Sequence, residues 1–229
     1  MSAALKVISS MATRQLLADL LALYRQTAAQ DVSVDSVGGV DAAKRVRAGE
    51  AFDAVALAAE TIDALIASGH IVAGSRVDLV RSGVSVAVRA GAPRPDIGSE
   101  EAVKRAVQAA RSLAYSTGPS GVQLAKLFER WGIAESVQAR LVQAPPGVPV
   151  GSLVADGKAD LGFQQLSELM SLPGIDVIGP LPPTIQIVTT FSAGLAATST
   201  QPQAARAMLA YLHSPATAQA KRDNGMEPP

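Results

Sequence analysis

The sequence feature that most constrains the fold is a repeated order of short apolar strand, polar or glycine-containing turn, and amphipathic helix. The first repeat runs from Leu5 to Tyr24, and its leucines recur at the spacing of one helical face. Its turn, Ser9-Ser10, stands where a helix N-cap is expected. Similar junctions follow strands predicted in the segments 32–37, 113–115 and 157–163. Strands that alternate with helices in this way predict an α/β protein with largely parallel sheets.

The remaining periodicities predict further short elements. Helices are expected at 41–47, 61–68, 99–110, 122–131, 166–170, 202–212 and 215–224. Strands are expected at 54–57, 77–88, 139–142, 175–178 and 185–191. We expect the strand at 77–88 to be interrupted at Ser82-Gly83, because glycine weakens a strand interior.

Proline and glycine suggest a division of the chain into two lobes. Stretches rich in these residues occur at 91–98 and near residue 180, where they break the regular pattern. We expect the β-prone segments 82–89 and 186–195 to connect the lobes. The expected first lobe comprises residues 1–84 and 188–229, and the inserted second lobe comprises residues 85–187.

Composition excludes several classes of function. The 229 residues carry no net formal charge and only 3% are aromatic, which argues against a nucleic-acid partner. The chain has no cysteine and two isolated histidines, so we expect no thiol chemistry and no zinc site. No apolar run approaches the roughly 18 to 20 residues that span a bilayer.

The junctions instead favour binding of a small anion. In parallel α/β sheets, ligands bind outside the carboxyl ends of the strands, where helices begin. A helix start carries unpaired N–H groups and partial positive charge, which attract anions. Arg14, one turn into the first helix, is either a cation of such a site or a solvated surface residue, and we expect the polar pair Ser116-Thr117 to add hydroxyls.

Five motifs occur in a recognisable order along the chain. They are Ser9-Ser10, Gly38-Gly39, Gly49-x-x-Phe-Asp-Ala-Val, Gly157-Lys-Ala-Asp-Leu-Gly-Phe163 and Asn224-Gly-Met-Glu-Pro228. Together they resemble the periplasmic solute-binding proteins of ABC transporters, specifically the molybdate-binding branch. The resemblance implies a type II fold of two α/β lobes joined by two β-strand hinges. It also implies a ligand held in the cleft between the lobes by hinge closure, without metal or cofactor.

The resemblance assigns ligand binding to residues at the helix starts. They are Ser9, Ser10, Met11, Gly38, Gly39, Pro119, Ser120, Gly121 and Val150. Where molybdate binders usually have a tyrosine after a strand, this chain has two amides, Gln164 and Gln165. We therefore expect these amides to contact the ligand, which is either a molybdate-like oxyanion or a small di- or tricarboxylate.

An enzymatic function is the alternative, because some proteins that resemble this branch are aconitate isomerases. That reaction moves a proton between carbons next to carboxylates, so it needs one base beside the anion site. The candidate bases are Tyr115, Glu168, His70 and His213. No complete catalytic motif stands out, so we expect a binding protein rather than an enzyme. An effector-sensing domain detached from a DNA-binding region ranks third.

The expected partners are a small anionic ligand and the membrane component of an ABC transporter, with no nucleic acid and a monomeric state. Met1 to Lys6 lead directly into the first strand, without a basic segment followed by an apolar one. We expect a periplasmic protein if a signal peptide has been removed, and a cytoplasmic one otherwise.

Overall fold

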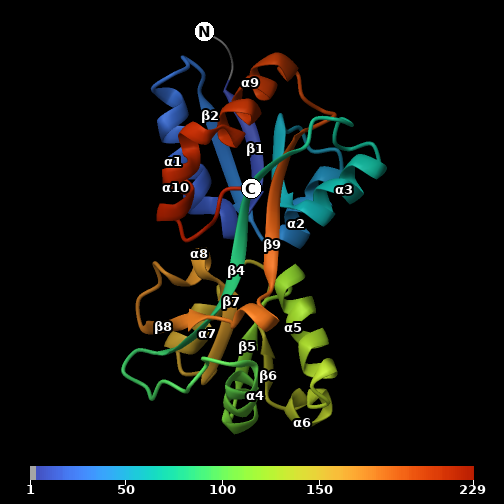
Figure 1. Cartoon of the computed structure of the whole chain (residues 1–229). Helices are drawn as coiled ribbons and strands as arrows, with labels where there is room; N and C mark the ends of the chain where they lie inside the picture. The colour runs from blue at the N-terminus through green and yellow to red at the C-terminus, as the bar shows by residue number, and fades with distance from the viewer. Residues whose placement is uncertain (1–3) are drawn as a thin grey trace. The chain divides into compact units, whose positions relative to one another are not determined.

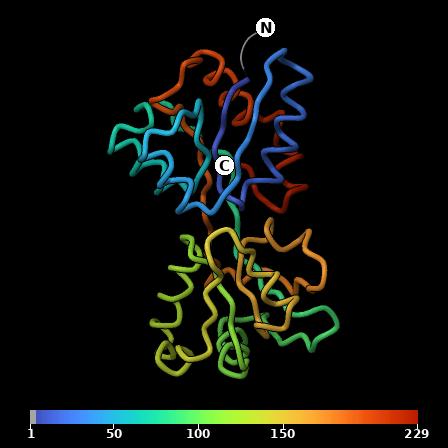
Figure 2. Tube along the Cα trace, turned by 180° about the vertical axis from the view of Figure 1, so that it is seen from behind, coloured from blue at the N-terminus to red at the C-terminus, as the bar shows by residue number. Residues whose placement is uncertain are grey.

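The computed structural model describes residues 4–229 and divides into two compact units. Unit 1 contains the chain up to Arg81 together with Thr190–Pro229, and unit 2 contains Ser82–Thr189. The blue N-terminal and red C-terminal segments therefore belong to the same unit (Figure 2). The expectation that Met1 to Lys6 lead directly into the first strand concerns residues 1–3 in part, and these lie outside the described residues.

The elements of unit 1 begin with a strand and a helix that follow each other almost directly. They are β1 (Leu5–Ser10), η1 (Met11–Thr13), α1 (Arg14–Arg25), β2 (Val32–Val37), α2 (Gly39–Arg47), β3 (Ala54–Ala58), α3 (Ala59–Ala67), α9 (Pro202–His213), η3 (Pro215–Thr217) and α10 (Ala218–Asp223). Two further strands, β4 (Val77–Arg89) and β9 (Val188–Leu195), contribute residues to both units.

The sheet of unit 1 has the order β2-β1-β3-β9, with β4 next to β9. Strand β1 pairs in parallel with β2 and β3, whereas β9 runs antiparallel to β3. Helices α1, α9 and α10 cover one face of this sheet, and α2 and α3 cover the other (Figure 1). The carboxyl ends of β1 and β2 therefore meet at one edge, with Ser9 opposite Ser36.

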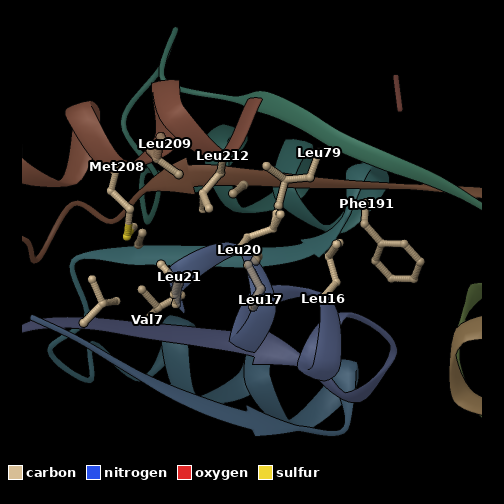
Figure 3. Close-up of a cluster of buried hydrophobic side chains, with 14 of the residues drawn as sticks. Val7, Leu16, Leu17, Leu20, Leu21, Leu79, Phe191, Met208, Leu209 and Leu212 are labelled. Atoms are coloured by element: carbon tan, nitrogen blue, oxygen red, sulfur yellow. The ribbon is translucent and has the colours of Figure 1, made fainter. Parts of the chain in front are cut away.

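The core of unit 1 is built on the leucine face of α1. Leu16, Leu17, Leu20 and Leu21 are all nearly inaccessible, because their spacing puts them on the side of the helix that faces the sheet. Figure 3 shows these side chains directed towards one another and towards residues of β4, β9 and α9. The partners labelled there include Leu79, Phe191, Met208, Leu209 and Leu212.

Unit 2 repeats the pattern of strand followed by helix. Its elements are α4 (Glu100–Ala109), β5 (Leu113–Tyr115), α5 (Pro119–Arg130), α6 (Ala134–Gln138), β6 (Leu141–Gln143), α7 (Val150–Ala155), β7 (Leu161–Gln165), α8 (Leu166–Leu169), β8 (Ile175–Pro180) and η2 (Pro183–Ile185). Strand β5 lies between β6 and β7 and is parallel to both, while β4 pairs antiparallel with β7 and β8.

Close packing in unit 2 brings α7 directly onto β7. A Cβ atom at Gly162 would lie 2.6 Å from Val154 Cγ2, so a glycine is required at this point of the strand. The start of α7 lies next to the carboxyl end of β7, because the Val150 N–H donates to Gln164 Oε1.

Three predictions about individual elements are wrong. Strand β4 runs without interruption through Ser82-Gly83, because Arg81 pairs with Glu227 and the Val84 N–H donates to the Ile187 carbonyl. The strand predicted at 139–142 instead covers 141–143, and it follows helix α6, which was not predicted. The β-prone run 185–191 divides into η2 and β9. No helix in residues 4–229 is long and apolar enough to cross a membrane.

Candidate functional site

In unit 1, the candidate site is formed where β1 and β2 end. Ser9 and Ser36 are opposite each other in the parallel register, and their hydroxyl oxygens are 2.7 Å apart in a hydrogen bond. Ser9 is fully buried and Ser10 is 6% exposed. The structure thus brings serines from two segments of the chain to one edge of the sheet.

Two helix starts lie next to Ser10. Met11 opens the short helix η1 that continues into α1, and within the described chain no side chain caps this start or the start of α2 at Gly38. A Cβ atom on Gly39 would lie 3.8 Å from Ser10 Cβ, which places the first residue of α2 against this serine. Uncapped first-turn amides of this kind suit an anionic group.

Thr13 is a candidate that the sequence analysis missed. Its side chain is fully buried, and its hydroxyl lies 3.4 Å from the Ser10 hydroxyl and donates to the Ser10 carbonyl. The signal was available, since a threonine three residues after a serine at a helix start lies on the same side of the first turn.

Arg14 is the first residue of α1 and is exposed. Within residues 4–229 its guanidinium forms no hydrogen bond or ion pair, in contrast to those of Arg45 and Arg76, which are each held by two carboxylates. A cation without an internal partner near Ser10 is available to a ligand with negative charge.

In unit 2, the corresponding feature is the junction between β5 and α5. The Ser116 and Ser120 hydroxyls lie 3.3 Å apart, and Pro119 is the first residue of the helix. A Cβ atom on Gly121 would lie 1.8 Å from the Ser116 carbonyl oxygen, so only glycine permits this tight turn. The predicted residues Ser116, Thr117, Pro119, Ser120 and Gly121 therefore all belong to one compact loop and helix start.

The two glutamines at the end of β7 have separate partners. The Val150 N–H donates to Gln164 Oε1 at 2.8 Å, and Gln165 Nε2 donates to Thr189 Oγ1 at 2.9 Å. Successive strand residues point to opposite faces, which explains why neighbouring amides reach different elements. The Val150 amide, for which we expect a ligand contact, is thus already paired with a buried side chain.

Glu168 follows these glutamines in α8 and is the titratable group of the candidate site with the most unusual environment. Burial raises the pKa of its carboxyl to about 7, and a hydrogen bond from Gln164 acts in the opposite direction. The residue is partly exposed, and the protein atoms around its carboxyl group desolvate it. Such a group exchanges a proton readily near neutral pH.

The other predicted bases have different surroundings. His70 follows the C-terminal end of α3 and interacts with the Ser68 hydroxyl and the Arg47 carbonyl. His213 ends α9 and lies 2.7 Å from the Asp78 carbonyl oxygen. Tyr115 ends β5 beside the Ser116 loop and is partly exposed. Among residues 4–229, no group of three or more histidine, aspartate or glutamate side chains could hold a metal ion.

Sequence comparison gives two matches that cover most of the chain. The family model described as bacterial extracellular solute-binding protein matches residues 5–227. An aconitate isomerase from Pseudomonas sp is 44% identical over 185 residues, which are 80% of this chain and 70% of that protein.

Structural comparison gives more distant matches that define the fold. The Azotobacter vinelandii periplasmic molybdate-binding protein is similar with a TM-score of 0.81 at 20% identity, over 98% of this chain and 99% of that one. The sulfate-binding protein SubI from Mycobacterium tuberculosis has a TM-score of 0.81 at 15% identity, over 99% and 87%. The predicted α/β fold of the type II periplasmic binding proteins is therefore confirmed.

Proposed function

The chain belongs to the bacterial extracellular solute-binding protein family, and we propose that it binds a small polycarboxylate and isomerises aconitate. The 44% identical aconitate isomerase supports a polycarboxylate, whereas structures at 20% identity or less indicate the fold alone. The single observation that carries the catalytic part of the proposal is Glu168 in α8, directly after β7, whose carboxyl has its pKa raised to about 7 by burial.

In this proposal the ligand is bound by uncharged hydrogen-bond donors and by one cation. Ser10 and the starts of α1 and α2 supply hydroxyl and amide donors in unit 1, and the Ser116–Gly121 loop supplies them in unit 2. Several dipoles share the charge of a carboxylate without a proton to lose, and Arg14 adds a full positive charge. In this proposal both sets of donors serve one ligand.

Glu168 would carry the proton. In the allylic isomerisation of aconitate, a base removes a proton from the methylene carbon, the double-bond electrons shift, and a proton returns to the former vinylic carbon. The ionised Glu168 carboxylate accepts the first proton and the protonated carboxyl returns it, so atoms and electrons balance without a further reactant. A pKa of about 7 leaves both forms accessible near neutral pH.

The test is an NMR assay of aconitate interconversion by the purified protein in deuterated water. We expect both isomers to appear from either one, with deuterium at the newly protonated carbon where the proton on Glu168 exchanges with solvent before it is returned. The Glu168→Gln variant should lose at least about 100-fold in kcat, because it cannot take up a proton. Wild-type kcat should fall below about pH 7, as protonation of Glu168 removes the base.

A thermal-shift assay with aconitate separates binding from chemistry, since a ligand of the native state raises Tm. We expect cis- or trans-aconitate to raise the Tm of both wild type and Glu168→Gln. Binding without interconversion at any pH, or an unchanged kcat in the variant, would contradict the proposed reaction.

A second candidate is a transport receptor without catalytic activity. The uncapped helix starts beside Ser10 and the family membership favour it, since such donors also suit an inorganic oxyanion. In that case the protein would act outside the cytoplasm, as a monomer, and deliver its ligand to the membrane component of an ABC transporter. A Tm increase with molybdate, tungstate or sulfate, and none with citrate or aconitate, would support this candidate instead.

A further inference from the structure

Thr13 is a fully buried residue whose hydroxyl has a single proton to donate. It is the last residue of η1 and follows Ser10 by three positions. Its hydroxyl oxygen lies 3.2 Å from the Ser10 carbonyl oxygen, and a carbonyl can only accept. The Thr13 proton is therefore donated to the Ser10 backbone, and Thr13 can offer a further partner only the lone pairs of its oxygen.

The same oxygen of Thr13 lies beside the side chain of Ser10. The two hydroxyl oxygens are 3.4 Å apart, and since Thr13 has already donated its proton, Ser10 is the donor in this contact. A hydrogen bond between two oxygens is ordinarily about 2.5–3.0 Å long, so this contact is weak. A carboxylate can replace Thr13 as the acceptor, because hydrogen bonds to ionised groups are shorter and stronger.

Ser10 occupies the N-cap position of η1, yet it makes no capping hydrogen bond with its side chain. Serine is favoured at an N-cap because its oxygen normally accepts from an N–H of the first turn. Here the hydroxyl is directed to Thr13 instead. Capping would place the oxygen over the first turn, so a serine that caps its own helix has its hydroxyl in a different position.

We propose that Thr13 is a positioning residue, which keeps the Ser10 hydroxyl off its own helix start and holds it ready for the ligand. The proposal rests on the proposed function, in which Ser10 donates to a carboxylate. Ser9 gives Ser10 less support, because its short hydrogen bond, at 2.7 Å, is with Ser36. The Ser9 hydroxyl is 3.4 Å from the Ser10 carbonyl oxygen, farther than that of Thr13.

The first experiment is NMR of the full chain without ligand, labelled with carbon-13 serine. The Ser10 signals are assigned by their loss in Ser10→Ala. In the wild type we expect the Hα–Hβ couplings of one side-chain rotamer. Thr13→Val keeps the branched shape and removes the hydroxyl, so these couplings should change as Ser10 turns towards its own helix start. Thr13→Ser retains the hydroxyl and should restore the wild-type couplings.

Calorimetric titration with aconitate measures the consequence for binding. We expect Thr13→Val to raise Kd about 5-fold, because Ser10 must then give up a capping contact of ordinary strength before it binds. Thr217→Val is the matched control, since this hydroxyl is equally buried in unit 1 and donates to the Leu212 and Ser214 carbonyls. The control should lose stability and leave Kd unchanged.

A double-mutant cycle tests whether Thr13 acts through Ser10. In that case Thr13→Val should weaken binding no further once Ser10→Ala has removed the hydroxyl. Three results would each overturn the proposal. They are unchanged Ser10 couplings in Thr13→Val, a loss of affinity that persists in the Ser10→Ala background, and an equal loss of affinity in Thr217→Val.

The Ser10 couplings and the isomerase assay fail independently. If aconitate is bound but not converted and the couplings change as expected, the proposed reaction is wrong and the positioning role stands. If aconitate is converted and the couplings are unchanged, only the positioning role is wrong. If aconitate is not bound, molybdate replaces it in the titration, and the couplings still decide the role of Thr13.

Where both proposals hold, the kinetics of Thr13→Val give a further check. The KM for aconitate should rise while kcat stays unchanged, because a donor that holds a carboxylate alike in the ground state and the transition state affects binding alone.

Discussion

Glu168 illustrates at the residue scale how a proposed function conflicts with stability. The folded protein binds a proton at this carboxyl more tightly than the unfolded chain, since its pKa is raised from 4.5 to about 7. Below pH 4.5 Glu168 is protonated in both the folded and the unfolded state, so its ionisation does not change the free energy of unfolding there. That free energy falls as the pH rises from 4.5 to 7, because the unfolded chain releases the proton in this range while the folded state still holds it.

We therefore expect Glu168→Gln to stabilise the protein at pH 8 by about 2 kcal/mol and to leave stability at pH 4 nearly unchanged. Urea unfolding followed by fluorescence checks this, because the single tryptophan, Trp131, lies in the same unit. An equal gain at both pH values would show that the buried charge is not the cause.

At the scale of elements, the junction between β5 and α5 depends on one close approach. The first turn of α5 passes so near the Ser116 carbonyl that a side chain at Gly121 has no room. The junction between β1 and α1 has no comparable requirement, because its donors come from serine and threonine side chains and uncapped amides. The two units thus present similar groups through different local structures.

Gly121→Ala should destabilise the protein by about 1–3 kcal/mol and weaken ligand binding, since the helix start must move away from Ser116. Gly39→Ala is the matched control for stability, because its Cβ atom would meet Ser10 at an ordinary contact distance of 3.8 Å. Thermal unfolding measures both variants, and an equal decrease in Tm for Gly121→Ala and Gly39→Ala would contradict this account.

At the scale of the whole molecule, the chain contributes candidate donors from both units. Ser10 belongs to unit 1 and Ser120 to unit 2, and each is at most 6% exposed at the start of a helix. The chain passes between the units within β4 and β9, so each unit has its own parallel strands and its own junctions. One ligand that uses both sets would couple the two units.

We expect Ser10→Ala and Ser120→Ala each to weaken binding of the same anion about 10-fold, because each removes one hydrogen bond to a charged group. Ser33→Ala is the control, since this serine lies near the amino end of β2 and donates to the Leu5 carbonyl. Calorimetric titration with aconitate would argue against a shared ligand if only one of the two site variants bound more weakly.

The sequence by itself determined the α/β class and the positions of the junctions in this protein. The leucine spacing of α1, the serines at the end of β1 and the glycines at the start of α2 are local features. Hydrophobic periodicity and turn chemistry over a few residues are readable from the sequence. Where elements depend on distant partners, as at Ser82-Gly83 in β4 or in the segment before β6, the same reasoning failed.

Only the tertiary structure decided the roles of the polar groups inside those elements. The pairing of Gln164 with Val150 joins residues 14 positions apart, and the contact of Ser9 with Ser36 joins residues 27 positions apart. The burial that raises the pKa of Glu168 depends on the packing around α8. Hydrogen bonding and desolvation are set by what surrounds a group in space, so a pattern of neighbours along the chain does not contain them.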